Sequence, residues 1–468
     1  MTLTLQDAKT SFAKRSFYVF SGRVLPVIVL FLITILYSRK LSYDDYGTFQ
    51  SVWMYANIIN VIISFGFISI LLTTNLSFLL SFIERNRSKI ITWYSLLIVI
   101  TFLLFFYFSR NFSIATLYIL ILFIIIRNLS IIADAFLIKI HKEKQVFIIN
   151  FFYSIIFLGW HLYVLYDKYD LNRLIWGSII ITAGKCLAML FFKWKTLPEP
   201  QQIEEDKVFS KHWLYLGLND ITSTFSKWLD KLFLLYLLIP ADFAIYFNGS
   251  FEIPLLASLI STLSTIVVLK IAENKTEIDK VTSLFSQNFK ILSAIVFPLF
   301  LFFLFYPNEL YSFLFNDRYN DSIPIFIVSI LIVPLRINDY YSILQCYSKG
   351  NVIITGSLID ICLGFILMIV LYPLMGTIGI ALAVVISTYC EMFYYLWQSS
   401  RIIKVSILDL FPVKYLFLNM VILTAASALV YFLLIDASPV FRLMIGGIFT
   451  AICIVAGLYY FYRRKLTF

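Results

Sequence analysis

Apolar runs of about 20 residues recur along almost the whole chain and limit what it can fold into. A helix of that length crosses the hydrocarbon core of a bilayer. The chain has 468 residues, of which 61% are hydrophobic and 14% charged, so it differs sharply from a soluble domain. The sequence therefore predicts an all-α polytopic membrane protein.

Hydropathy windows predict about 14 transmembrane helices. A polar segment at 193–212, with Pro198, Pro200 and several Glu and Gln residues, is the longest predicted linker. We expect a six-helix lobe at 1–192, a cytoplasmic linker at 193–212, a second six-helix lobe at 213–400 and two additional helices at 401–468. The predicted spans are 17–37, 52–80, 91–108, 112–138, 146–166, 174–192, 213–239, 243–270, 289–306, 322–345, 352–373, 376–397, 415–435 and 440–462.

The basic residues indicate the orientation of these helices. Lys and Arg number 37 against 27 Asp and Glu, and they concentrate in every second connection. This asymmetry predicts cytoplasmic N- and C-termini under the positive-inside rule, and it accounts for the basic balance better than a nucleic-acid partner does. The first apolar run is longer than a signal-peptide core and predicts an uncleaved span.

The two halves show traces of a repeat. DFAIY at Asp242–Tyr246 overlies DYGTF at Asp45–Phe49, and the same alignment pairs Arg23 with Asp220. Equivalent spans would run in the same direction, so the predicted lobes are pseudo-symmetric.

One predicted span carries charge in its middle. Within Lys211–Pro254, a polar stripe at helical spacing is formed by Asp220, Ser223, Thr224, Lys227, Asp230 and Lys231. A charge at the bilayer centre costs about 2.5 to 3.5 kcal/mol on insertion scales. We therefore expect this stripe to face water or other helices, as one wall of a transport cavity.

Further charges fall inside predicted spans. The basic ones are Arg23, Arg127, Lys185, Lys227, Lys231 and Arg336, and the mid-span acidic one is Glu252. A water-filled cationic cavity would suit an anionic substrate. The alternative is internal pairing: Lys227 with Asp230 or Asp220, or Arg23 with Asp220. Snorkelling to the headgroups is the alternative interpretation for Asp134, Asp339, Asp360, Glu391 and Arg336.

The sequence contains no catalytic motif and predicts no enzyme. There is no P-loop, nucleophile elbow or zinc motif, and the five Cys and three His have no metal-ligand spacing. We expect no cofactor and no metal site. An ion gradient or the membrane potential would drive transport.

Several segments resemble the polysaccharide transporter (O-antigen flippase) family of the multidrug/oligosaccharidyl-lipid/polysaccharide (MOP) exporter superfamily. That family shows an Asp, apolar residues and then Gly-x-Tyr, and Asp230 and Tyr246 match this pattern, with Ala244 in place of Gly. LSYDDYGTFQ near the start is similar to the family's opening. FNDRYNDSIPIFIV and YPLMGTIGIALAVVIS are similar to its later spans.

The resemblance implies two lobes around a central cavity that opens to each side in turn. Its implied substrate is an oligosaccharide on undecaprenyl diphosphate, flipped across the bacterial inner membrane for O-antigen, capsule or exopolysaccharide. Arg23 and Lys227 are the first candidates to hold the diphosphate or acidic sugars, followed by Arg127, Lys185, Lys231 and Arg336.

The acidic candidates have other expected roles. Asp220 and Asp230 are candidates for ion coupling or pairing. Glu252 departs from the family pattern and is a candidate for proton or sodium coupling. A polysaccharide polymerase and a chain-length regulator are candidate partners. Two alternatives stay open: a cation-coupled multidrug exporter of the same superfamily, and a scaffold of a glycan-assembly complex that transports nothing.

Overall fold

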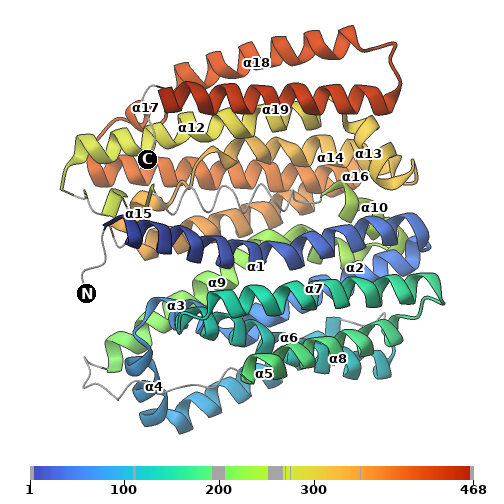
Figure 1. Ribbon diagram of the computed structural model, residues 1–468, viewed down its shortest axis with the longest axis vertical. Coiled ribbons are helices and arrows are strands. Elements are labelled where there is room, and N and C mark those ends of the chain that lie inside the picture. The colour runs from blue at the N-terminus through green and yellow to red at the C-terminus, as the bar shows by residue number, and fades with distance from the viewer. Residues whose placement is uncertain are drawn as a thin grey trace. The chain divides into compact units, whose positions relative to one another are not determined.

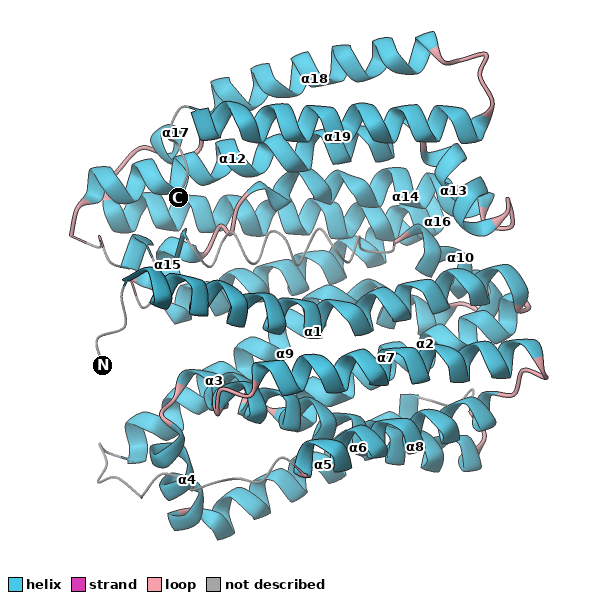
Figure 2. Cartoon of the chain, viewed as in Figure 1, coloured by secondary structure: helices cyan, strands magenta, loops and turns pink. Residues whose placement is uncertain are grey.

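The structure is a computed structural model that describes residues 5–108, 112–191, 206–250, 267–268, 270–272, 274, 276–347 and 349–463. Within these ranges every regular element is a helix, and no strand occurs (Figure 2). The fold class predicted from the sequence is therefore confirmed.

The chain forms two compact units, Met1–Trp228 and Leu229–Phe468. Unit 1 contains α1 (Leu5–Lys40), α2 (Tyr43–Ser64), α3 (Phe67–Thr73), α4 (Leu76–Arg85), α5 (Arg87–Phe108), α6 (Ile114–Lys139), α7 (Glu143–Tyr166) and α8 (Leu171–Leu190). The division between the units falls inside α9 (Asp206–Leu237), so the first part of α9 belongs to unit 1 and its end to unit 2. The predicted lobes at 1–192 and 213–400 stay a prediction.

Unit 2 holds the later helices. They are α10 (Pro240–Gly249), α12 (Ile278–Phe305), α13 (Pro307–Phe315), η1 (Asn320–Ser322), α14 (Ile323–Ser329), η2 (Ile330–Ile337), α15 (Ser342–Cys346), α16 (Gly350–Ile403), α17 (Ile407–Leu410), α18 (Val413–Leu433) and α19 (Pro439–Arg463). Figure 1 shows the helices in chain order by colour.

Close packing in unit 1 depends on small residues. α1 packs along α7, and α8 packs against both α6 and α7. A Cβ atom at Gly22 of α1 would lie 3.3 Å from the Phe147 backbone of α7. Gly177 of α8 likewise makes room for the Trp160 ring of α7, whose Nε1 donates to the Leu174 carbonyl at 3.1 Å. The absence of a side chain at these positions allows the helices to approach closely, as is common between membrane helices.

The predicted span at 52–80 is broken. Phe65 and Gly66 both have left-handed backbone angles, and α2 and α3 meet there at 58°. α9 crosses unit 1 at this break, where Trp213 Nε1 donates to the Phe65 carbonyl at 2.9 Å. A Cβ atom at Gly66 would lie 2.6 Å from the backbone nitrogen of Gly217. At the bend, the backbone of Gly66 therefore closely approaches the backbone of Gly217 of α9.

In unit 2, α12 is the central helix and packs against α18, α19 and η2. Gly446 and Gly457 of α19 lie where a Cβ atom would meet Tyr306 at 2.6 Å and Ala294 at 2.8 Å. An ion pair of 2.8 Å joins Arg442 of α19 to the buried Glu309 of α13. These contacts fix the C-terminal hairpin of α18 and α19 to the rest of the unit.

The long helix α16 contains two of the predicted spans, 352–373 and 376–397. Gly376 interrupts its helical geometry with φ 58° and ψ −140°. Few residues other than glycine adopt these angles. The sequence break predicted between the two spans thus lies at this kink.

The described part of the chain has 10 helices long and apolar enough to cross a membrane, or 11 if α2 and α3 form one span. α16 counts once among these although it covers two predicted spans. Of the predicted span 322–345, the contiguous segment Asn320–Ile337, made of η1, α14 and η2, is one of these candidate spans, and α15 follows after a break. Most of 243–270 lies outside the described residues. The molecule is a multi-pass membrane protein, and the total of 14 spans remains a prediction.

Candidate functional site

Arg127 is a partly buried cation of unit 1 for which the described structure shows no ion pair with a carboxylate. Its Nη2 atom donates to Asn57 Oδ1 of α2 at 2.7 Å. The guanidinium carbon lies 5.2 Å from the centre of the Trp53 ring, also on α2. Nη1 is buried, and no described group accepts a hydrogen bond from it. The guanidinium is therefore held by a neutral amide and an aromatic face, so its positive charge remains available to an anionic group.

Lys185 of α8 is in a different situation from Arg127. Its Nζ atom lies 2.6 Å from Asp134 Oδ2 of α6, and the Lys185 side chain is only 8% exposed. Asn150 of α7 donates to the other oxygen of Asp134 at 3.2 Å. The internal pairing considered as the alternative thus occurs at Lys185. From the sequence, Asp134 is expected to snorkel to the headgroups. In the structure its carboxylate instead forms an ion pair inside unit 1.

Arg23 lies exposed on α1, next to the contact of Gly22 with α7. No described residue forms a hydrogen bond or ion pair with it. The expected pair of Arg23 with Asp220 is absent from the described structure. Asp220 instead accepts a hydrogen bond from Ser69 of α3 at 2.8 Å.

The predicted polar stripe on α9 does not have one uniform environment. Lys227 is exposed, whereas Asp230 and Lys231 are 4% and 9% exposed. Lys231 Nζ lies 3.1 Å from Asp230 Oδ2, and Tyr246 donates its hydroxyl to the same oxygen at 2.7 Å. The Asp230 end of the stripe is therefore a closed cluster inside unit 2.

The remaining predicted site residues lie in unit 2 or beyond the described ranges. Arg336 is exposed at the end of η2. Glu252 lies outside the described residues. Asp360 and Glu391 are 5% and 8% exposed, and Tyr395 donates to Glu391 at 2.9 Å, so the snorkelling interpretation of these two carboxylates is wrong.

Sequence reasoning missed Asn57 and Trp53, the two residues that hold Arg127. An amide and an indole inside an apolar run carry no charge and match no motif, so hydropathy does not distinguish them. A signal was present nonetheless, because a mid-span arginine requires a polar or aromatic partner.

A family model described as "Polysaccharide biosynthesis protein" matches residues 36–324. No curated protein matches the sequence. Among solved structures, the chain is similar to the lipid II flippase MurJ in an inward closed conformation, with 17% identity and a TM-score of 0.68 over 97% of this chain and 100% of that one.

Two further solved structures share the fold. One is an outward-facing multidrug resistance MATE family transporter of the MOP superfamily, with 13% identity and a TM-score of 0.57 over 84% of this chain and 95% of that one. The other is a MOP superfamily transporter from Pyrococcus furiosus with reverse polarity of its binding pocket. It has 13% identity and a TM-score of 0.59 over 84% of this chain and 96% of that one.

Proposed function

Because the chain belongs to the polysaccharide biosynthesis protein family, we propose that it moves a lipid-linked oligosaccharide across a membrane. The substrate is a repeat unit on undecaprenyl diphosphate, destined for O-antigen, capsule or exopolysaccharide. It passes from the inner to the outer leaflet of a bacterial inner membrane, by alternating access and with both termini cytoplasmic. An ion gradient or the membrane potential drives the cycle.

The observation that carries this proposal is the environment of Arg127. A partly buried guanidinium without a carboxylate partner is costly in a membrane span, and an anionic ligand would offset that cost. Diphosphate and acidic sugars provide such an anion, and Arg binds phosphate oxygens through directed, charge-assisted hydrogen bonds. Arg23 and Lys227, both exposed, are the next candidates to bind the substrate.

Lys185 and Lys231 are weaker candidates within the same proposal. Each forms an ion pair with a neighbouring aspartate, so an anionic substrate would have to displace that aspartate. Arg336, exposed at the end of η2, stays a proposed substrate-binding residue. Glu252, Asp220 and Asp230 remain proposed coupling or pairing groups.

The first test removes the gene and restores it with single variants. Cells without the gene should accumulate complete repeat units on the lipid carrier and lose the surface polymer. Arg127→Gln should leave the protein in the membrane but lower the surface polymer about tenfold or more, the effect of losing one charge-assisted contact. Arg173→Gln is the control, because Arg173 is a half-exposed arginine already paired with Asp167 at 2.7 Å.

Other outcomes favour the alternatives. Unchanged polymer together with increased sensitivity to cationic drugs would favour a multidrug exporter, which the MATE-like fold allows. Loss of polymer in the deletion strain, combined with no lipid transport by the purified protein in liposomes, would favour a scaffold. If both arginine variants behave alike, Arg127 does not bind the substrate.

A further inference from the structure

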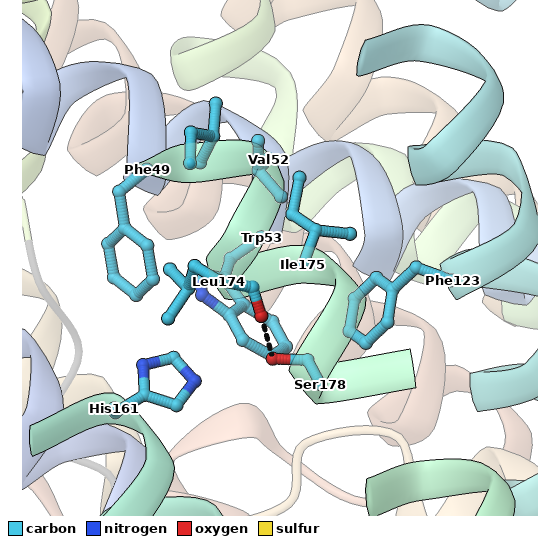
Figure 3. Close-up of a pocket in the computed structure, with 9 residues that line it drawn as sticks. Phe49, Val52, Trp53, Phe123, His161, Leu174, Ile175 and Ser178 are labelled. Carbon is cyan, nitrogen blue, oxygen red and sulfur yellow. Dashed lines mark hydrogen bonds between the residues drawn. The ribbon is translucent and has the colours of Figure 1, made fainter. Parts of the chain in front are cut away.

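A small cavity lies within unit 1 between α2, α6, α7 and α8. Its lining is mostly apolar but includes one imidazole, one indole and one hydroxyl, those of His161, Trp53 and Ser178 (Figure 3). The cavity has room for about one water molecule. These three polar residues come from three different helices, so a ligand at this position would join α2, α7 and α8.

His161 is fully buried and uses only one of its ring nitrogens within the described structure. Nδ1 lies 3.0 Å from the Tyr37 hydroxyl of α1. That hydroxyl also lies 3.1 Å from the His161 carbonyl, to which it donates its single proton. Both contacts are satisfied when Nδ1 carries the imidazole proton and donates to the Tyr37 oxygen. Nε2 then presents a bare lone pair, and no described group donates to it.

The indole of Trp53, in contrast, has a hydrogen-bond donor without an acceptor in the described structure. Its Nε1–H is buried, and no described group accepts from it. A buried polar group whose hydrogen bond is unmet destabilises the folded state. Ser178 donates its hydroxyl proton to the Leu174 carbonyl at 2.9 Å, so its oxygen is still able to accept (Figure 3).

We propose that one water molecule occupies this cavity and joins His161, Trp53 and Ser178. The water accepts from Trp53 Nε1 and donates one proton to His161 Nε2 and the other to the Ser178 oxygen. Three partners are the usual number for a buried water molecule. The donors and acceptors match fully only for the neutral imidazole with its proton on Nδ1.

The surrounding groups favour this neutral state. Phe157, Phe49 and Tyr37 surround the ring, with the Phe157 centroid 4.4 Å from that of His161. No described carboxylate forms an ion pair with His161, whereas the Arg127 guanidinium lies over the Trp53 ring. A second positive charge on the imidazole would meet burial and a nearby cation without a counterion.

Nitrogen NMR of protein labelled with ¹⁵N-histidine, in lipid nanodiscs, tests the proposal. The chain has three histidines, and His141 and His212 are exposed, so His161→Gln assigns the buried signal. We expect a proton bonded to Nδ1, none bonded to Nε2, and magnetisation transfer between Nε2 and a water proton. A proton on Nε2, a charged ring or no transfer from water would overturn the proposal.

Thermal unfolding of variants gives an independent test. Trp53→Phe and Ser178→Ala each remove one partner of the same water molecule, so their losses in melting temperature should be less than additive. Thr182→Ala is the matched control, because Thr182 is a buried hydroxyl one turn along α8 that does not line the cavity. Its loss should add to that of Trp53→Phe. Additive losses for Trp53 with Ser178 would contradict a shared water molecule. Neither measurement depends on transport activity.

Discussion

Tyr246 donates its hydroxyl to Asp230 at 2.7 Å, and both side chains are buried in unit 2. The two residues are those that linked the sequence to its family by their spacing. Because Asp230 lies on α9 and Tyr246 on α10, the bond holds the end of one helix to the next. Asp230 also pairs with Lys231 at 3.1 Å, so the hydroxyl and the ammonium share one carboxylate oxygen.

Tyr246→Phe should lower the free energy of unfolding by about 1–3 kcal/mol. The phenyl ring keeps the packing, but the buried carboxylate of Asp230 loses a hydrogen bond. Thermal unfolding of the purified protein in detergent measures this loss. Tyr389→Phe is the control, because Tyr389 is exposed and its hydroxyl bonds to the Leu331 carbonyl. Equal losses in the two variants would mean that the buried bond to Asp230 adds no more stability than the exposed bond of Tyr389.

The helices could be predicted because membrane helices are local features of the sequence. Hydropathy over about 20 residues located α5 to α8, α18 and α19 to within a few residues of their observed bounds. It placed the end of one span too late: the span predicted at 322–345 ends at Ile337, and the polar residues Asn338 and Asp339 separate it from α15. It also merged α2 with α3, because the left-handed pair of Phe65 and Gly66 is apolar and gives no hydropathy signal.

The partners of the charged residues could not be predicted from the sequence. Lys185 and Asp134 are 51 residues apart, and only the packing of α6 against α8 brings them together. The same applies to Arg127 and Asn57, which are 70 residues apart. The pair of Asp230 with the adjacent Lys231 was likewise not among the pairs that spacing within one helix suggested. A charged residue inside a predicted span thus indicates that it has a partner, but the sequence does not identify which residue that partner is.

Lys185→Met should destabilise unit 1 by about 3–5 kcal/mol, because it leaves the Asp134 carboxylate without its counterion. Adding Asp134→Asn should recover most of that loss, since the amide is neutral and can still accept from Asn150. Unfolding followed by tryptophan fluorescence compares the single and double variants. A double variant less stable than Lys185→Met would show that the ion pair is not what stabilises this region.

Asn57→Asp should change stability and transport in opposite directions. The substitution is nearly isosteric and places a carboxylate 2.7 Å from Arg127 Nη2, where the amide oxygen now lies. The free energy of unfolding should rise by about 1–3 kcal/mol because the partly buried charge of Arg127 gains a counterion. Transport of the proposed anionic substrate should fall about tenfold, because the guanidinium is then neutralised.

Asn57→Leu separates the two effects on Arg127. It removes the hydrogen bond without adding charge, so it should lower stability while leaving the guanidinium positive. Melting temperature and surface polymer are measured on the same strains. If Asn57→Asp retained full transport, the positive charge of Arg127 would have no role in binding.

Two glycines with positive φ should respond differently to alanine. Gly376 has φ 58° and ψ −140°, and nothing lies within 4 Å of a Cβ atom built there. Gly376→Ala should therefore cost only the backbone strain, about 1–3 kcal/mol. Gly66 has φ 71°, and its Cβ atom would lie 2.6 Å from the Gly217 nitrogen, a backbone atom that cannot move without α9. Gly66→Ala should cost clearly more, because the clash adds to the strain.

Parallel thermal unfolding of the two alanine variants checks this difference. Ala is also placed at Gly159, where the surroundings are open and φ is not positive, as the control for adding a methyl group to a membrane helix. The expected order of stability is Gly159→Ala, then Gly376→Ala, then Gly66→Ala as the least stable. If Gly66→Ala were as stable as Gly376→Ala, α9 would have to yield at Gly217, and the crossing at the bend would be adaptable rather than fixed.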